Sequence, residues 1–251
     1  SINYSKKIQQ AIFPQTDLLK NYYKDSFIYN KPKDKIGGDF PWVKKQGNSL
    51  YLGVVDCTGH GVPGALMSVV TYFLIDKINN QVHDFTPSEI LNHLHLNVNR
   101  KLGQHFENAD CKDGADISLC KIDTFSNILE YSGAHRPLLI YRKGELIEIK
   151  GDKYPIGGMH YAKKRKRFVN NTFQLLKGDI VLMFSDGYTD QFGSTENERV
   201  QKYGMRRVRE LLNEETDWNM AQLENYIINE LNTWKGMEKQ TDDILIVGVK
   251  I

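Results

Sequence analysis

The order of strand-like and helix-like runs most constrains how this 251-residue chain can fold. Short apolar runs of strand type come first, and two helix-like segments follow them. A long series of short strands comes next, before two further helix-like segments and a last strand. The pair Gly47-Asn48, between two of the runs, signals a hairpin. Segregated runs joined by hairpins favour antiparallel sheets and an α+β fold over alternating βαβ units.

The expected elements follow from the apolar periodicity and the turn residues. The predicted strands cover residues 26–30, 39–45, 49–56, 115–122, 128–132, 138–142, 145–149, 172–176, 180–185 and 243–249. The predicted helices cover residues 62–79, 87–102, 203–213 and 217–234. Residues 177–179 are expected to join the two strands beside them as another pair. No low-complexity stretch or internal repeat divides residues 17–251, so we predict one domain there.

The N-terminal segment has a separate character. Residues 2–13 carry Ile8, Ala11 and Ile12 at roughly helical spacing, and Pro14 is expected to end this helix. A short amphipathic helix has little of its own to pack against, so we interpret residues 1–16 as a linker or regulatory helix that continues an upstream element. We predict a homodimer built through it. The chain starts at Ser1 without a methionine, which suggests a piece of a longer protein.

Composition excludes several classes of function. The formal net charge of +2 and the pI of about 8.2 are too mild to predict a nucleic-acid or anionic-membrane partner. We find no apolar run near the roughly 18–20 residues that span a bilayer, and no signal peptide. Cys57, Cys111 and Cys120 show no zinc-like spacing, which is typical of reduced thiols in a cytoplasmic protein.

Four aspartates stand beside apolar strand-like runs: Asp39, Asp56, Asp186 and Asp242. Any one alone is readily explained as a turn or cap residue. Four carboxylates that converged at buried strand ends would lose hydration and repel one another unless cations lay among them. Hard oxygen ligands favour Mg²⁺ or Mn²⁺ over zinc. The pattern therefore predicts a metal centre.

The segment 56–65 combines a strand-end carboxylate, a glycine turn and a helix start, which suits an anionic phosphate. Its glycines also match G-x-G-x-x-G, but no βαβ unit follows, so a dinucleotide site is not indicated.

Several blocks occur in a recognisable order: GGDF at 37–40, DCTGHGVPGALM at 56–67, YPIG at 154–157, GD at 178–179, SDGYTD at 185–190 and TDDI at 241–244. Together they resemble the SpoIIE-type branch of the PPM family, the metal-dependent serine/threonine phosphatases related to protein phosphatase 2C. Residues 8–14 resemble the linker helix that precedes such domains. The resemblance covers nearly the whole chain, and the block at 56–67 is its most specific part.

The resemblance implies an αββα sandwich, in which two antiparallel sheets are flanked by helices, with two Mn²⁺ or Mg²⁺ ions at one edge. It implies the following ligands: Asp39, Asp56 as the bridging carboxylate, the carbonyl of Cys57, Asp186, and Asp242 with Asp243 as the alternate. Two such ions can lower the pKa of a shared water and neutralise charge on a phosphoryl group, so no protein nucleophile is needed.

His60 is a candidate general acid for the leaving serine oxygen, although a role in capping the following helix explains it equally well. No arginine precedes Arg100, so the early phosphate-binding arginine of the protein phosphatase 2C branch is absent, and Lys33 or Lys35 are possible helpers. The SpoIIE branch generally lacks that arginine.

Three positions depart from the usual blocks without changing a carboxylate: Pro41, Thr58 and the segment SGAHRP at 132–137. We interpret His135 and Arg136 in that segment as a feature of a strand turn.

The resemblance implies hydrolysis of phosphoserine or phosphothreonine on a small STAS-domain regulator, of the anti-anti-sigma type, in bacterial signalling. It also implies control by an upstream sensor domain through the linker helix, and a cytoplasmic location, either as a separate protein or as the cytoplasmic domain of a larger sensor protein. Two alternatives stay open. One is a catalytically silent scaffold, which the intact carboxylates disfavour. The other is a two-metal phosphoesterase that acts on a small molecule.

Overall fold

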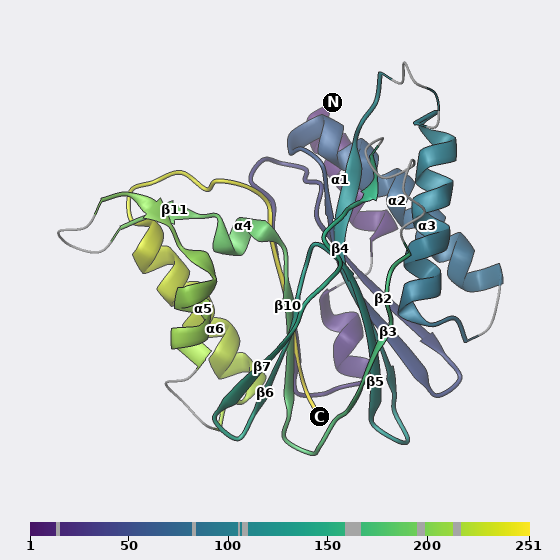
Figure 1. The fold of residues 1–251 in the computed structure, drawn as a ribbon. Helices are drawn as coiled ribbons and strands as arrows, with labels where there is room; N and C mark the ends of the chain where they lie inside the picture. The colour runs from purple at the N-terminus through teal and green to yellow at the C-terminus, as the bar shows by residue number, and fades with distance from the viewer. Residues whose placement is uncertain are drawn as a thin grey trace.

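The computed structural model describes residues 1–13, 16–81, 84–104, 106, 110–158, 167–194, 199–212 and 217–251. Two antiparallel sheets form the centre of the molecule (Figure 1). The first has the order β1 (Ser26–Lys31), β13 (Ile244–Lys250), β10 (Ile180–Phe184), β6 (Leu138–Arg142) and β7 (Glu145–Ile149). The second has the order β2 (Phe40–Gln46), β3 (Ser49–Cys57), β4 (Gly114–Asp123), β5 (Ile128–Ala134) and β9 (Asn171–Gln174), and β8 (Ile156–Gly157) pairs with β4.

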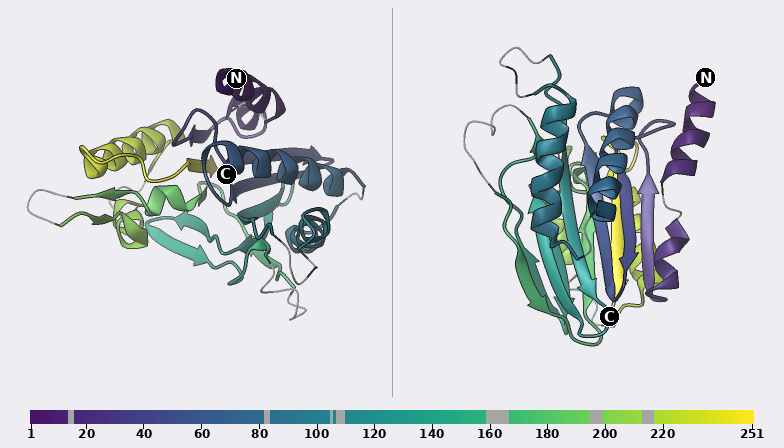
Figure 2. Two further views of the ribbon diagram at one scale, coloured as in Figure 1. Left: turned by 90° about the horizontal axis from the view of Figure 1, so that it is seen from above. Right: turned by 90° about the vertical axis from the view of Figure 1, so that its right-hand side faces the viewer.

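Helices cover the outer faces of both sheets, as the views in Figures 1 and 2 show. On the outer face of the second sheet lie α2 (Gly61–Gln81) and α3 (Pro87–Lys101), which contact β3 and β5 respectively. On the first sheet, α6 (Met220–Lys235) contacts β1 and β13, and α5 (Gly204–Leu212) lies beside α6. The predicted α+β sandwich of two antiparallel sheets flanked by helices is confirmed.

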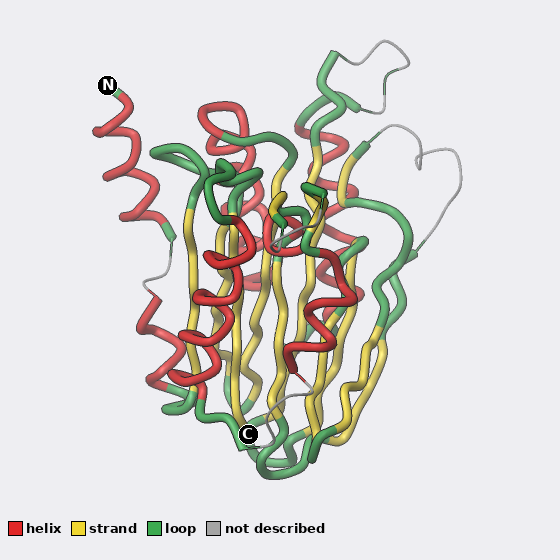
Figure 3. The backbone as a smooth tube through the Cα atoms, turned by 90° about the vertical axis from the view of Figure 1, so that its left-hand side faces the viewer, coloured by secondary structure: helices red, strands yellow, loops and turns green. Residues whose placement is uncertain are grey.

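Three apolar layers hold this arrangement together. The layer between the sheets includes Leu50 and Val54 from one sheet and Leu245 and Val247 from the other. A second layer joins α2 and α3 to the second sheet, and a third joins α5 and α6 to the first. The strands stand upright between the helices in Figure 3. Strands that are buried on both faces, such as β3 and β10, read as nearly continuous apolar runs in the sequence.

Local signals place the helix starts. Thr86 and Glu89 form a capping box before α3, where Pro87 takes the first turn. Asn219 and Gln222 form the same box before α6, which begins three residues after the predicted start at residue 217. These side chains satisfy backbone N–H groups that a helix start leaves without partners.

The predicted pairing of residues 172–176 with 180–185 is wrong. β9 pairs with β5, whereas β10 lies between β13 and β6 in the other sheet. The turn between them, with Gly178 at a φ of +92°, therefore carries the chain from one sheet to the other. All five residues of β10 are buried, as an interior strand requires, whereas β9 alternates between half-buried and exposed positions at an edge.

Periodicity missed the shortest elements: a 3-10 helix at Thr16–Asn21, β8, α4 (Asp186–Thr189), β11 (Phe192–Gly193) and β12 (Gln201–Lys202). The last two form a small separate ribbon. Four of these five elements have only two to four residues, too few to show a hydrophobic period.

The predicted N-terminal helix is present as α1 (Ile2–Ile12), and it lies at the margin of the molecule in the right-hand view of Figure 2. None of its residues is buried, and Ile2, Tyr4 and Ile8 are exposed. Pro14, the expected end of the helix, lies outside the described residues.

One described helix, α2, is long and apolar enough by length and hydropathy to cross a membrane, which the sequence reading did not anticipate. Its inner face packs against the second sheet through residues such as Met67, Ile75 and Ile78. The core helix of a globular domain satisfies the same criterion, so this observation is weak evidence for a span.

Candidate metal centre

The four predicted ligand aspartates come together at one edge of the sandwich, two beside strands of each sheet. Asp39 directly precedes β2, and Asp56 is the last residue but one of β3. These strands are paired, with Phe40 opposite Val55, so the start of one lies beside the end of the other. Asp186 follows β10 at the start of α4, and Asp242 precedes β13. β10 and β13 are likewise paired, with Phe184 opposite Ile246.

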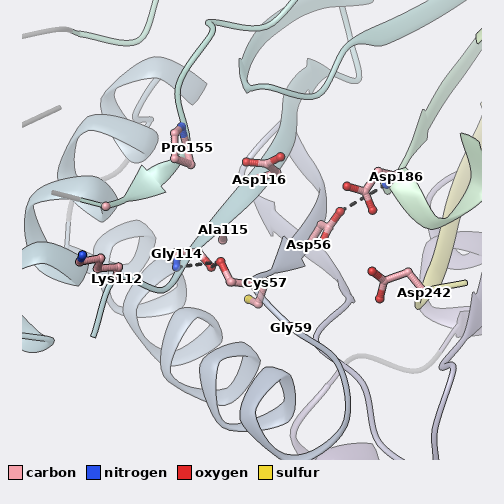
Figure 4. Close-up of a pocket in the computed structure, with 12 residues that line it drawn as sticks. Asp56, Cys57, Gly59, Lys112, Gly114, Ala115, Asp116, Pro155, Asp186 and Asp242 are labelled. Carbon is pink, nitrogen blue, oxygen red and sulfur yellow. Dashed lines mark hydrogen bonds between the residues drawn. The ribbon is translucent and has the colours of Figure 1, made fainter. Parts of the chain in front are cut away.

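A pocket of about 240 Å³ opens at this edge. Its lining includes Asp56, Asp116, Asp186 and Asp242. Figure 4 shows the carboxylates of Asp56 and Asp186 close to one another, with Asp116 and Asp242 on either side. Asp39 is not among these lining residues: it is buried, with 5% of its surface exposed, and it contributes to the lining of a second pocket beside α1.

Asp39 has a buried oxygen without a partner. Within the described part of the chain, its Oδ2 atom makes no hydrogen bond. Burial, followed by the neighbouring charge of Asp56, raises the pKa of Asp39 well above its ordinary value. A buried carboxylate of this kind is costly unless it is protonated or a cation compensates it. The orphaned oxygen therefore fits a hard cation at this position.

Asp56 lies directly opposite Asp116 in the register of β3 and β4. Like charges in such a cross-strand pair repel each other. The backbone N–H of Asp186 donates to Asp56 Oδ2 at 3.3 Å, which brings the ends of β3 and β10 together. Burial, then the charge of Asp186, raises the pKa of Asp56 to about 8.

Asp242 and Asp243 have different surroundings. Both carboxylate oxygens of Asp243 accept backbone hydrogen bonds, Oδ1 from Lys33 N–H at 2.7 Å and Oδ2 from Gly38 N–H at 2.6 Å. Asp243 thus fastens the loop before β2 to the start of β13. Asp242 instead lines the pocket with Asp56 and Asp186. This arrangement favours Asp242 over Asp243 as the ligand.

The backbone at the Cys57 carbonyl packs closely against the backbone of Gly38. A Cβ atom on Gly38 would come within 2.8 Å of the carbonyl oxygens of Cys57 and Gly59, so only glycine fits there without a shift. Thr58 braces the same strand end, because its N–H donates to the Gly114 carbonyl and its Oγ1 accepts from Gly114 N–H, both at 3.0 Å.

His60 lies apart from the carboxylates that line the pocket. Its Nδ1 atom is 3.0 Å from Asp34 Oδ2, and its Nε2 atom is 3.0 Å from Lys33 Nζ. The other suggested helper, Lys35, donates from Nζ to Asn3 Oδ1 on α1. The structure therefore places Lys33 with His60 and turns Lys35 toward the N-terminal helix.

The sequence reading missed Asp116 and the contacts of Arg136. Arg136 Nη2 donates to Asp116 Oδ2 at 2.7 Å and to Asp186 Oδ2 at 2.8 Å. His135 Nδ1 lies 2.9 Å from Asp116 Oδ1. Two signals pointed here: an aspartate inside the apolar run at 115–122, and an arginine where the family block usually has none.

The oxygens that face this edge are carboxylate and carbonyl oxygens, a donor set typical of Mg²⁺ or Mn²⁺. Among the described residues, no three carboxylate, imidazole or thiol groups stand in an arrangement that could hold a metal ion as they are. The fit to a cation therefore comes from the donor chemistry and the orphaned oxygen of Asp39.

Comparison with known proteins adds further findings. A family model described as stage II sporulation protein E (SpoIIE) matches residues 46–251. The phosphoserine phosphatase RsbU of Bacillus subtilis (strain 168) is 25% identical over 219 residues, which cover 83% of this chain and 58% of that protein. This chain thus spans little more than half the length of that relative.

Two solved structures are similar over most of the chain. The SiaA-PP2C domain of Pseudomonas aeruginosa has a TM-score of 0.87 and 29% identity, over 100% of this chain and 95% of that one. RsbX, solved in complex with magnesium, has a TM-score of 0.61 and 16% identity, over 90% of this chain and 94% of that one. At that identity the second likeness concerns the fold alone.

Proposed function

Because this chain belongs to the SpoIIE family, we propose that it is a metal-dependent serine/threonine protein phosphatase of bacterial signalling. The observation that carries the proposal is the group of carboxylates at this edge: Asp39, which is buried with an orphaned oxygen, and Asp56, Asp186 and Asp242, which line the pocket. RsbU, named as a phosphoserine phosphatase, and the SiaA-PP2C domain support the same activity.

The residues proposed to hold two Mn²⁺ or Mg²⁺ ions are Asp39, Asp56 as the bridging ligand, Asp186, Asp242 and the carbonyl of Cys57. When bound, such ions supply an activated water and neutralise charge on the phosphoryl group. The magnesium in the RsbX structure supports a hard cation.

The protein's own contribution is to hold these oxygens in place. Asp243 and Thr58 fix the strand ends through backbone hydrogen bonds, so the ligand carboxylates need little reorganisation. His60 is the proposed donor of a proton to the leaving serine oxygen. Asp34 holds the ring at 3.0 Å from Nδ1, and Lys33, which donates to Nε2, must move away before that nitrogen can carry the proton.

Lys112 is exposed and lines the same pocket. A cation beside the carboxylates suits a substrate that carries a phosphate group.

The test of the metal centre is Mn²⁺-dependent hydrolysis of an aryl phosphate by the wild type and by Asp186→Asn. We expect the variant to lose activity by roughly 100-fold or more, because loss of a ligand exceeds the effect of disturbing its supporting contacts. Asp190→Asn is the matched control, since Asp190 lies four residues later and pairs with Lys202 at 2.7 Å. Equal activity of the wild type and Asp186→Asn would sink the assignment.

The proposed substrate is phosphoserine or phosphothreonine on a STAS-domain-like regulatory protein. A phosphorylated protein of this kind and small phosphoesters should be compared as rival substrates by kcat/KM. A clear preference for small phosphoesters would replace this proposal with a small-molecule phosphoesterase. Specific binding of the protein without turnover would point to a silent scaffold.

Control through the N-terminal helix is proposed as well, with residues 1–16 as the linker to an upstream sensor domain and residues 17–251 as the phosphatase domain. Gln9 on α1 connects the helix to the site: its Nε2 donates to the Gly37 carbonyl at 2.7 Å and to Ser68 Oγ at 3.1 Å. Gly37 stands two residues before Asp39, so a movement of α1 reaches a ligand directly.

The exposed side chains of Ile2, Tyr4 and Ile8 make α1 the proposed contact of a homodimer. Sedimentation of a purely monomeric species at high protein concentration would contradict this. The unpaired cysteines agree with the proposed cytoplasmic location. The mild net charge of +2 gives no reason to propose a nucleic-acid partner.

A further inference from the structure

Arg136 places a cation among the carboxylates of the proposed metal centre. One nitrogen, Nη2, bonds both Asp116 and Asp186, at 2.7 and 2.8 Å. Its Nε atom lies 3.9 Å from Asp56 Oδ2 and, within the described residues, is buried without a hydrogen-bond partner. The guanidinium thus contacts one proposed ligand and approaches another.

The turn that carries Arg136 is firmly fixed. The preceding residue, His135, has a φ of +59°, a strained value for a residue with a side chain. The buried Tyr131 hydroxyl donates to the Arg136 carbonyl. A Cβ atom on Gly151 would come within 2.5 Å of that same carbonyl oxygen, so the turn needs glycine there. This arrangement holds the backbone of Arg136 in place, so any change in its carboxylate partners must come from a movement of the side chain.

We propose that Arg136 is an internal counter-cation that neutralises Asp116 and Asp186 in the metal-free protein and gives up Asp186 when metal ions enter. This inference rests on the proposed metal centre. Its consequence is competition: the apparent affinity for metal is the intrinsic affinity reduced by the cost of separating the guanidinium from its carboxylates.

Electrostatics gives the reason. Asp56 and Asp116 face each other across β3 and β4, and Asp186 lies against Asp56, so three carboxylates share one small space. Without a cation these charges repel one another strongly in a partly buried site. Divalent ions bound to Asp56 and Asp186 would in turn repel a guanidinium held between them. The Asp186 carboxylate can therefore pair with the Arg136 guanidinium or with a metal ion, but not with both at once.

The experiment measures Mn²⁺ binding to wild type and Arg136→Gln by isothermal titration calorimetry, beside melting temperatures in EDTA. We expect the variant to bind Mn²⁺ about tenfold more tightly or more, since charged hydrogen bonds no longer have to be broken. We also expect the metal-free variant to melt at a lower temperature. Arg209→Gln is the control, because it removes the same charge from α5, where Arg209 pairs with Glu148.

Each outcome decides a different point. Equal or weaker Mn²⁺ binding by folded Arg136→Gln would overturn the counter-cation proposal and leave the metal centre intact. A raised KM for phosphoprotein with unchanged Mn²⁺ affinity would also overturn it, and would make Arg136 a substrate-binding residue. If the wild type bound no Mn²⁺, both this inference and the proposed function would fail.

Two further measurements guard against a variant that does not fold. Arg136→Lys keeps the charge but cannot reproduce the planar guanidinium, so its Mn²⁺ affinity should lie between those of the wild type and Arg136→Gln. Crystal structures of the wild type with and without Mn²⁺ need no variant. We expect Nη2 to leave Asp186 in the loaded form, and a retained contact beside two bound ions would refute the proposal.

Discussion

At the scale of single residues, the candidate site is a group of carboxylates kept at high pKa. Burial is the main cause for Asp39, Asp56, Asp186 and Asp243, and like charges add to it. The metal-free native state therefore retains protons that the unfolded chain releases at lower pH. Such a site is stable only with protons or cations, and this makes its stability depend on pH in a definite direction.

The first prediction is that the metal-free protein becomes less stable as pH rises from about 4 to about 8. Asp56 sets this window, because its ordinary value of 3.8 applies to the unfolded chain and its native pKa is about 8. Over this range the native state binds more protons than the unfolded state, so the free energy of unfolding falls. Urea denaturation in EDTA at several pH values measures it. The difference between wild type and Asp56→Asn isolates the contribution of this carboxyl, and a difference that does not change with pH would refute the prediction.

A second prediction separates the neighbouring aspartates. Asp243→Asn should lower the free energy of unfolding by roughly 1–3 kcal/mol, because one of its two backbone N–H partners loses its acceptor in a buried place. Asp242→Asn should leave the metal-free fold nearly as stable and should weaken Mn²⁺ binding. Denaturation curves and calorimetric titration of both variants check this. If Asp242→Asn lowered the stability and Asp243→Asn weakened Mn²⁺ binding, Asp243 would be the ligand and Asp242 the structural residue.

The same pair shows what sequence could and could not supply at this scale. The glycine-rich blocks and strand ends identified Asp39, Asp56 and Asp186, which the fold does bring to one edge. Nothing in the motif decides between Asp242 and its neighbour, since that depends on backbone N–H groups some 200 residues away, with separations of 210 and 205. Asp116 was missed for a similar reason, because its importance depends on a cross-strand register.

At the scale of elements, α1 is a helix whose position depends little on buried apolar contacts. It buries no residue and is connected to the domain through Gln9, which bonds Gly37 and Ser68. Lys35 adds a contact to Asn3 at 3.0 Å. Phe13, the residue after the helix, stacks on Phe40 at 4.8 Å and holds its C-terminal end, so the polar contacts of the helix itself are the ones that can open at low cost.

The third prediction is that Gln9→Ala releases α1 without unfolding the domain. Hydrogen exchange in residues 2–12 should become faster, while the free energy of global unfolding changes by only about 1 kcal/mol, the net value of a hydrogen bond. Turnover should change together with exchange, because Gly37 stands beside the ligand loop. Gln10→Ala is the matched control, since Gln10 is exposed on the same helix. Equal exchange in the two variants would contradict this role of Gln9.

Most long elements were predictable because their apolar periods are clear, and the strands at Leu138–Arg142 and Glu145–Ile149 match to the residue. The partner of β9 was not predictable in the same way. A short turn between two strands usually makes a hairpin, but here β9 pairs with β5 and β10 pairs with β13 and β6 in the other sheet.

At the scale of the whole molecule, the four proposed ligand aspartates are shared equally between the two sheets. Asp39 and Asp56 belong to one sheet, and Asp186 and Asp242 to the other. A cation bound by all of them binds the native arrangement and not the unfolded chain, so it stabilises the fold by mass action.

The fourth prediction is that Mn²⁺ raises the melting temperature of the protein treated with EDTA. At a concentration 100 times the dissociation constant, one bound ion should add about 2.7 kcal/mol to the free energy of unfolding. The effect should be lost in Asp56→Asn and kept in Asp190→Asn. Scanning calorimetry over a series of Mn²⁺ concentrations measures it, and an unchanged melting temperature in the wild type would count against metal binding.

Because the ligands come from both sheets, the geometry of the site depends on how the two sheets are positioned relative to each other. The sheets touch through an apolar layer that includes Leu50 and Leu245, and no direction is imposed on such contacts by hydrogen bonds. A small slip of one sheet along the other would change the spacing between the ligand pairs while leaving each pair intact. Substitutions in this layer, remote from every carboxylate, should therefore alter metal affinity before they alter the fold.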